Sequence, residues 1–224
     1  MTEKVLCVCA HPDDETFGCG ATLAKHAEAG DQIGLVVMAD GLASRGGVSA
    51  ANIAKRHGMC RRAWDIIGGK RPENNYVYLH QFADNMMDNC ALLEPVRYIE
   101  RHIAGFKPTI VYTHWNGDLN VDHRVVHDAV NVACRPQPGC SVKRLLYFEV
   151  PCSTTWGSGF TPNHFVNVAA TWETKLKACQ EYVDELRDEP HPRSVTGIDT
   201  LATWRGYSAG LEMAEAFIVG RWIA

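Results

Sequence analysis

The sequence lacks the features that would place the protein on nucleic acid or in a membrane. Its 224 residues contain no long basic tract, and 26 acidic against 22 basic residues give a formal net charge of −4. This balance argues against nucleic acid or an anionic membrane surface as the partner. No apolar run is long enough to cross a bilayer, and the first residues do not resemble a signal peptide. We therefore expect no membrane span and no nucleic-acid partner.

The sequence also lacks a pattern of paired cysteines. It has nine cysteines, an odd number, and none are spaced as C-x-x-C. Several lie inside apolar runs, namely Cys7, Cys9, Cys134 and Cys179. This distribution is typical of reduced, buried thiols in a cytoplasmic protein and argues against a disulfide framework.

Apolar residues make up 46% of the chain and charged residues 21%. Such a composition allows a sizeable core and argues against global disorder. No repeat, low-complexity segment or linker divides the sequence. Because 224 residues is an ordinary length for one α/β unit, we predict a single domain over residues 1–224.

Apolar, β-prone runs alternate with segments of helical periodicity. Strands are predicted at 4–10, 32–39, 76–82, 108–113, 144–150 and 165–169. Helices are predicted at 17–29, 50–67, 91–104, 123–134, 172–186 and 194–210, and a loop at 40–49. This alternation predicts an α/β, Rossmann-like fold, in which a mostly parallel sheet has helices on both faces.

Polar, reactive residues follow three of these strands. The first strand runs into HPDDE at 11–15, the second into Asp40, and the strand at 108–113 into His114. In an open parallel sheet, ligands bind beyond the carboxyl ends of the strands. Taken alone, Asp13 or Asp14 could simply cap the following helix, and a lone histidine is more often structural. Their convergence at one edge favours a functional site.

The residue types at this edge suit a metal ion. A histidine, a carboxylate and a second histidine, with positions left for water, form a common catalytic zinc arrangement. His11 and Asp14 are three residues apart across a turn, and His123 begins a later predicted helix. Asp13 would then be an acid beside the metal, able to take a proton from water.

These motifs resemble the PIG-L/LmbE-like family of zinc-dependent N-deacetylases. The resemblance rests on AHPDDE, the glycine-rich entry to the next helix, DLNVDHR at 118–124, and the closing HPRS and MAEAF segments. It implies a Rossmann-like fold and removal of acetyl groups from N-acetylglucosamine units or related amino sugars. The implied partner is a small N-acetylated sugar or glycoconjugate, and a homo-oligomer is left open.

The resemblance also assigns roles to residues. It implies zinc ligands at His11, Asp14 and His123, and a general base at Asp13. It places Arg56 near the substrate and Asp122 behind the catalytic site. We add Asp40 as a substrate contact because of its place after the second strand.

One position departs from the family pattern. Many members have H-x-D-H where this chain has Asn120 two residues before Asp122. An asparagine can donate a hydrogen bond to an oxyanion, but it cannot supply a proton. We predict that His114 protonates the leaving amine, with His191 as second choice.

Some residues keep two interpretations. Trp115, Trp156 and Trp204 could stack on a sugar or could pack structurally. The segment at 45–47 could form a mobile loop over the site or only a turn.

Two other functions are compatible with parts of this pattern. One is a non-catalytic nucleotide- or sugar-binding module. The other is a magnesium-dependent transferase, which two histidine ligands disfavour because magnesium prefers oxygen.

Overall fold

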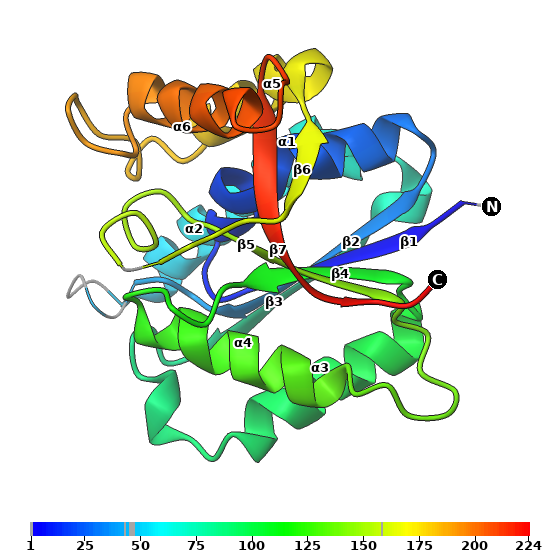
Figure 1. Ribbon diagram of the computed structural model, residues 1–224. Helices are drawn as coiled ribbons and strands as arrows, with labels where there is room; N and C mark the ends of the chain where they lie inside the picture. Colours follow the sequence, from blue (N-terminus) through cyan, green and yellow to red (C-terminus); the bar gives the residue numbers. More distant parts are fainter. Residues whose placement is uncertain (1, 43, 45–47, 158) are drawn as a thin grey trace.

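A seven-stranded sheet with the order β3-β2-β1-β4-β5-β7-β6 forms the centre of the molecule. The computed structural model describes residues 2–42, 44, 48–157 and 159–224 (Figure 1). The strands are β1 (Lys4–Cys9), β2 (Gln32–Ala39), β3 (Tyr76–Phe82), β4 (Ile110–His114), β5 (Arg144–Phe148), β6 (His164–Asn167) and β7 (Ala214–Trp222). The first five strands are parallel, whereas β7 runs antiparallel to both β5 and β6. The predicted mostly parallel sheet is therefore confirmed.

Helices cover both faces of this sheet (Figure 1). One face carries α1 (Asp14–Glu28), α2 (Ala50–Trp64), α5 (Trp172–Gln180) and α6 (Val195–Tyr207), and the other carries α3 (Leu93–Phe106) and α4 (Val121–Ala133). Short helical turns lie at η2 (Asp65–Gly69), η3 (Pro72–Asn74), η4 (Met87–Asn89) and η5 (Ala169–Thr171).

The apolar run of β1 supplies both cores. Val5, Cys7 and Cys9 face the helical layer of α1, whereas Leu6 and Val8 face α3 and α4. All five are fully buried. Each large apolar side chain buried in this way contributes about 1.5–3 kcal/mol to folding. A strand buried on both faces explains why its sequence is continuously apolar rather than alternating.

The C-terminal strand β7 was not predicted. The sequence predicted only a helix in the tail, whereas the structure has an additional nine-residue strand after α6. Its partners, β5 and β6, are remote in sequence. The pattern of apolar residues within one segment does not show which distant strands it pairs with.

Helix α1 begins at Asp14, earlier than predicted, and is broken at Cys19, where φ is −144°. At the break, the Glu215 carboxylate accepts hydrogen bonds from the N–H groups of Ala21 and Thr22, at 3.1 and 2.7 Å. Lys175 pairs with Glu215 at 2.6 Å and also donates to the carbonyl of Phe17 at 2.7 Å. A buried ion pair from α5 and β7 thus satisfies backbone groups that the break leaves free.

A close approach requires glycine near the start of α1. A Cβ atom at Gly18 would lie 2.5 Å from the Phe148 ring at the end of β5. The first turn of α1 is therefore pressed against the carboxyl end of the sheet.

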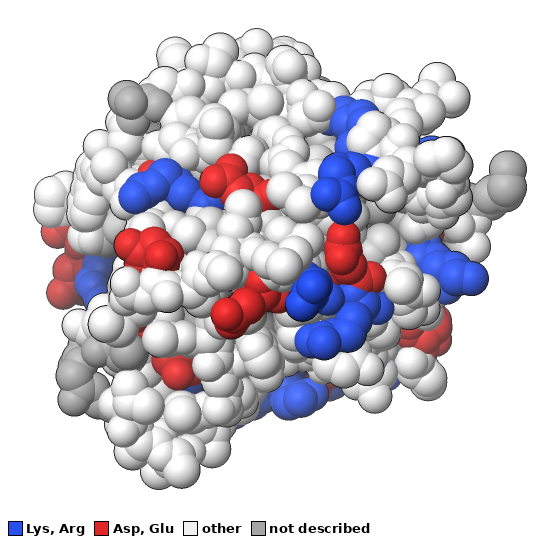
Figure 2. All heavy atoms as spheres, turned by 90° about the horizontal axis from the view of Figure 1, so that it is seen from below, with Lys and Arg blue, Asp and Glu red and all other residues white. Residues whose placement is uncertain are grey.

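Within the described residues, no helix is long and apolar enough to cross a membrane. On the face that carries α3 and α4, basic and acidic side chains are interspersed (Figure 2).

Candidate active site

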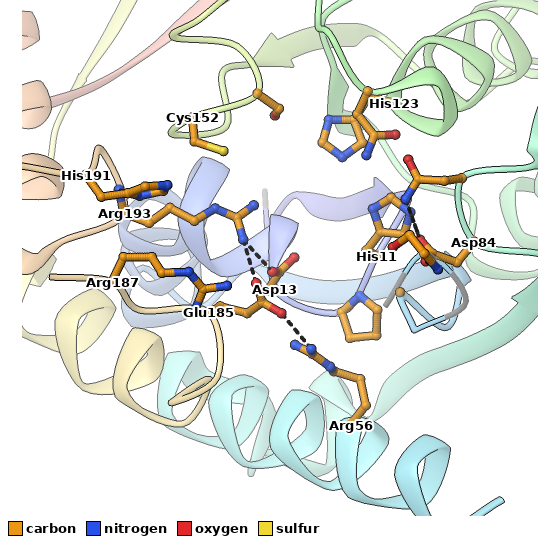
Figure 3. Close-up of a pocket in the computed structure, with 16 residues that line it drawn as sticks. His11, Asp13, Arg56, Asp84, His123, Cys152, Glu185, Arg187, His191 and Arg193 are labelled. Carbon is orange, nitrogen blue, oxygen red and sulfur yellow. Dashed lines mark hydrogen bonds and ion pairs between the residues drawn. The ribbon is translucent and has the colours of Figure 1, made fainter. Parts of the chain in front are cut away.

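A cavity of about 220 Å³ lies at the carboxyl ends of the parallel strands. Its lining comes from the β1–α1 turn, the loops after β2 and β3, the start of α4, and two C-terminal loops (Figure 3). Residues that line it include His11, Asp13, Arg56, Asp84, Asn120, His123, Cys152, Glu185, Arg187, His191 and Arg193. This is the edge of the sheet at which the sequence predicted a site.

His11, Asp14 and His123 bring three donor atoms within 4.8 Å of one another. Nδ1 of His11 lies 3.5 Å and Nε2 of His123 lies 3.4 Å from Oδ2 of Asp14. The second carboxylate oxygen, Oδ1, is buried without a hydrogen-bond partner among the described residues. Leaving such an oxygen unpaired costs about 1–3 kcal/mol or more. This mixed nitrogen and oxygen set fits a borderline cation such as zinc.

The charge of Asp14 is favoured by its neighbours. Burial alone would raise the pKa of Asp14, but the rings of His123 and His114 lower it well below its usual range. A buried anion facing two histidines is what a cation site requires.

Acidic residues orient both histidines from behind. Nε2 of His11 lies 2.9 Å from Asp122 and 3.1 Å from Asp84, so its other nitrogen faces Asp14. Nδ1 of His123 lies 3.2 Å from Asp118. Carboxylates in this position fix the ring and increase its basicity as a ligand.

The His11, Asp84 and Asp122 side chains also lie close enough to hold a cation. However, the two Asp122 oxygens already accept the N–H groups of Asn85 and Met87, at 2.6 and 3.0 Å. We therefore interpret Asp122 and Asp84 as supports of His11.

Asp13 lies at the cavity beside this cluster and is 4% exposed. It occupies the position before α1, but its side chain makes no capping hydrogen bond, so the helix-cap interpretation does not account for it. Its φ of 137° is rare for a non-glycine residue and costs about 1–3 kcal/mol. Burial raises the pKa of Asp13 to about 7, although Arg193, 3.0 Å away, opposes the rise.

A chain of ion pairs continues from Asp13. Arg193 bridges Asp13 and Glu185, at 3.0 Å to each, and Glu185 also binds Arg56 at 2.6 Å (Figure 3). Arg56 also lines the cavity, and its contact with a substrate stays a prediction. Arg193, Glu185 and Asp118 are residues of the site that the sequence did not predict. The HPRS and DLNVDHR segments contain Arg193 and Asp118, but neither motif shows which of its residues meet Asp13 or His123.

The placement of His114 contradicts its predicted role as the proton donor. The side chain is fully buried, and its Nε2 accepts a hydrogen bond from the N–H of Ala10 at 2.9 Å. Burial lowers its pKa to about 4, so the ring is neutral. It stacks on His123 with ring centroids 3.9 Å apart. His114 therefore supports the metal cluster. It is not among the described residues that line the cavity, and its neutral ring is too weak an acid to protonate a substrate amine.

The placement of Asp40 contradicts the predicted substrate contact. Its Oδ1 accepts the N–H of Leu42 at 2.9 Å, which makes it a turn residue. The following Gly41 and Ser44 line the cavity instead. The predicted loop at 45–47 lies outside the described residues.

Asn120 and His191 both line the cavity. Asn120 caps α4, because its side-chain oxygen accepts the N–H of Asp122 at 2.9 Å. The N–H groups of its side-chain amide can therefore donate hydrogen bonds to a ligand. Nδ1 of His191 accepts the N–H of Arg193 at 3.0 Å.

The fold and the site together define a class, that of Rossmann-like proteins with a histidine–aspartate cluster suited to a catalytic metal. The model of the PIG-L family, GlcNAc-PI de-N-acetylase, matches residues 6–134. The chain belongs to this family.

Related sequences agree with this assignment. The chain is 34% identical over 185 residues to YaiS of Escherichia coli (strain K12), described as an uncharacterized deacetylase, covering 80% of this chain and 89% of YaiS. It is 25% identical over 224 residues to the diacetylchitobiose deacetylase of Thermococcus kodakarensis, covering 95% of this chain and 81% of that protein.

Solved structures share the fold. The N,N'-diacetylchitobiose deacetylase of Pyrococcus horikoshii has a TM-score of 0.77 at 20% identity, covering 97% of this chain and 83% of that one. GalB, a 4-carboxy-2-hydroxymuconate hydratase from Pseudomonas putida KT2440, has a TM-score of 0.74 at 19% identity, covering 98% of this chain and 96% of GalB. Because a hydratase has the same fold, the fold alone does not define the reaction.

Proposed function

We propose that the protein is a zinc-dependent hydrolase that removes the N-acetyl group from an amino sugar or amino-sugar conjugate. The observation that carries this proposal is the position of Asp13, a cavity-lining carboxylate next to a three-donor cluster that it does not join. The family description and the name of the Thermococcus relative support the substrate class.

His11, Asp14 and His123 would hold the metal. A zinc ion there would polarise the acetamide carbonyl and lower the pKa of the attacking water. Two histidine nitrogens favour zinc over magnesium, which prefers oxygen donors.

Asp13 would accept the proton of the attacking water. A pKa of about 7 suits this task, because a base works best when its pKa lies near the operating pH. Arg193 would hold the Asp13 carboxylate toward the cavity through their 3.0 Å contact.

Asn120 and His191 would assist the reaction. The amide N–H of Asn120 would stabilise the oxyanion. Since Nδ1 of His191 already accepts a hydrogen bond, the neutral ring carries its hydrogen on Nε2. This N–H can donate a hydrogen bond to the substrate, but a neutral imidazole is too weak an acid to protonate an amine. We propose that the leaving amine receives the proton that Asp13 has taken from the attacking water.

Acetate release from a panel of N-acetylated sugars and glycosides tests the proposed function. We expect about one zinc per chain by elemental analysis, the stoichiometry of a catalytic site with three protein ligands. Chelation should stop acetate release, and added zinc should restore it. A His164→Ala variant, changed in a histidine of β6, should match the wild type. Full zinc occupancy without acetate release from any N-acetylated sugar would overturn the proposal.

A further inference from the structure

A second hollow, of about 450 Å³, lies beside the catalytic cavity. We call it the α6 groove. Its lining is Pro151, Thr155, Glu189, Pro190, Pro192, Ser194, Thr196, Gly197, Thr200, Leu201 and Trp204. Trp204, which is 64% exposed, contributes the largest apolar side chain of this lining.

A segment of consecutive turns, residues 189–194, separates the groove from the catalytic cavity. His191 and Arg193 line the catalytic cavity, whereas Pro190, Pro192 and Ser194 line the groove. Successive residues therefore face opposite sides of a wall that is one residue thick. The two hollows are neighbours across this wall.

The wall is fixed in place. Nε of Arg193 donates to the carbonyl of Pro151 at 3.2 Å, while its Nη1 contacts Asp13. Trp156, which is 58% exposed, lies beside the wall, with its ring centroid 5.2 Å from that of His191.

Size points to an occupant that uses both hollows. Ligand pockets usually measure roughly 300–1,000 Å³. The catalytic cavity, at about 220 Å³, falls below that range, whereas the groove adds about 450 Å³. An N-acetylated sugar in the cavity would leave the groove for whatever is attached to it.

The chemistry of the groove favours an apolar group. Two of its hydroxyl-bearing residues are already engaged: Thr196 donates to Glu189 at 2.5 Å, and Ser194 caps α6 by accepting the N–H of Gly197. The surface that remains is dominated by prolines, Leu201 and the Trp204 ring. Exposed apolar surface of this kind marks binding sites.

We propose that the α6 groove binds an apolar aglycone, an aryl or alkyl group joined to the amino sugar, and that Trp204 is a specificity-determining residue. This inference rests on the proposed deacetylase function. It predicts that glycosides with such a group are better substrates than the free sugar.

The test compares acetate release by the zinc-loaded full chain from methyl, octyl and 4-nitrophenyl glycosides of N-acetylglucosamine. The wild type should prefer the octyl and aryl glycosides in kcat/KM. Trp204→Ala should reduce this preference about three- to tenfold, the scale of one aromatic contact. The loss should appear in KM, with turnover of the methyl glycoside unchanged.

A matched control is Trp222→Ala. Trp222 is 51% exposed and pairs with Arg144 at the opposite end of the sheet. This variant should keep the full preference.

Several outcomes separate the groove from the proposed function. Equal kcat/KM values for all three glycosides would overturn the groove proposal and leave the deacetylase standing. A preference for N,N'-diacetylchitobiose over the octyl glycoside, lost in Trp204→Ala, would overturn the apolar occupant in favour of a second sugar. If no glycoside released acetate, calorimetric binding of octyl glucoside, weakened in Trp204→Ala only, would still support the groove, and absent binding would overturn it.

Discussion

The catalytic cavity has two walls that are built in different ways. The metal wall consists of His11, Asp14 and His123, which stand at the ends of β1 and at the starts of α1 and α4. The arginine wall consists of Arg56, Glu185 and Arg193, which come from α2 and from a loop near the C-terminus. The residues of the metal wall are positioned by the strand and helix ends that carry them. The residues of the arginine wall are positioned by ion pairs between segments that are remote in sequence.

This difference shows how one fold can keep its chemistry while its substrate changes. Residues at strand and helix ends are positioned by backbone hydrogen bonds, so their geometry follows from the fold. Loops that meet through side chains can be rebuilt without disturbing the sheet. Four variants, taken from the largest expected effect to the smallest, test this distinction.

The largest effect is expected for Asp14→Ala. The variant removes the carboxylate that faces both histidines of the metal wall. Zinc content and acetate release should both fall to background. Elemental analysis beside the activity assay checks this, and a variant that kept its zinc would show that Asp14 is not a ligand.

The Asp13→Asn variant tests whether Asp13 is a general base or a metal ligand. Activity should fall roughly 10²–10⁴-fold, the scale of a lost general base. Zinc should stay bound, because Asp13 is not part of the donor cluster. If zinc were lost instead, the roles of the two aspartates would have to be exchanged.

Asp118→Asn should have a smaller effect through the metal wall. Asp118 lies behind His123 and accepts the hydroxyls of Ser153 and Thr154. Removing its charge should weaken zinc binding roughly 10–100-fold, the usual cost of losing a residue behind a ligand. A zinc titration against a competing chelator measures it, and an unchanged affinity would exclude this supporting role.

Arg193→Gln should give the smallest of these losses and should depend on pH. Arg193 lowers the pKa of Asp13, so its removal raises that pKa and leaves less of the basic form at neutral pH. The acid limb of the kcat/KM profile should therefore move to higher pH, and activity should recover as the pH rises. The control Arg62→Gln changes an arginine that is 57% exposed and paired with Glu181 away from the cavity. An Arg193→Gln profile identical to that of the control would remove Arg193 from the site.

The sequence predicted the metal wall better than the arginine wall. The strands β1 and β2 and the residues at 11–15 are visible because they are contiguous and follow a buried apolar run. Asp122 and Asn120 are visible because they adjoin His123. The pairing of Arg193 with Asp13 joins residues 180 positions apart. No local pattern contains that contact.

The errors have the same physical origin. His114 follows a strand and bears a titratable ring, which made it a natural acid in the sequence. Its role is decided by the N–H of Ala10, 104 positions away, which occupies its Nε2. Strand β7 was missed because β5 and β6, rather than its own periodicity, hold it in the sheet.

The break in α1 has a consequence for how this chain can be divided. All three donor residues lie within the first 123 positions. The helix that carries Asp14, however, is completed by Lys175 and Glu215, whose side chains satisfy the backbone groups freed at Cys19. A fragment ending near residue 134 would contain all three donor residues. It would lose Lys175 and Glu215, which bind the backbone of α1 on both sides of its break. Minimal versions of this protein should therefore be shortened at loops, and the terminal strand should be kept.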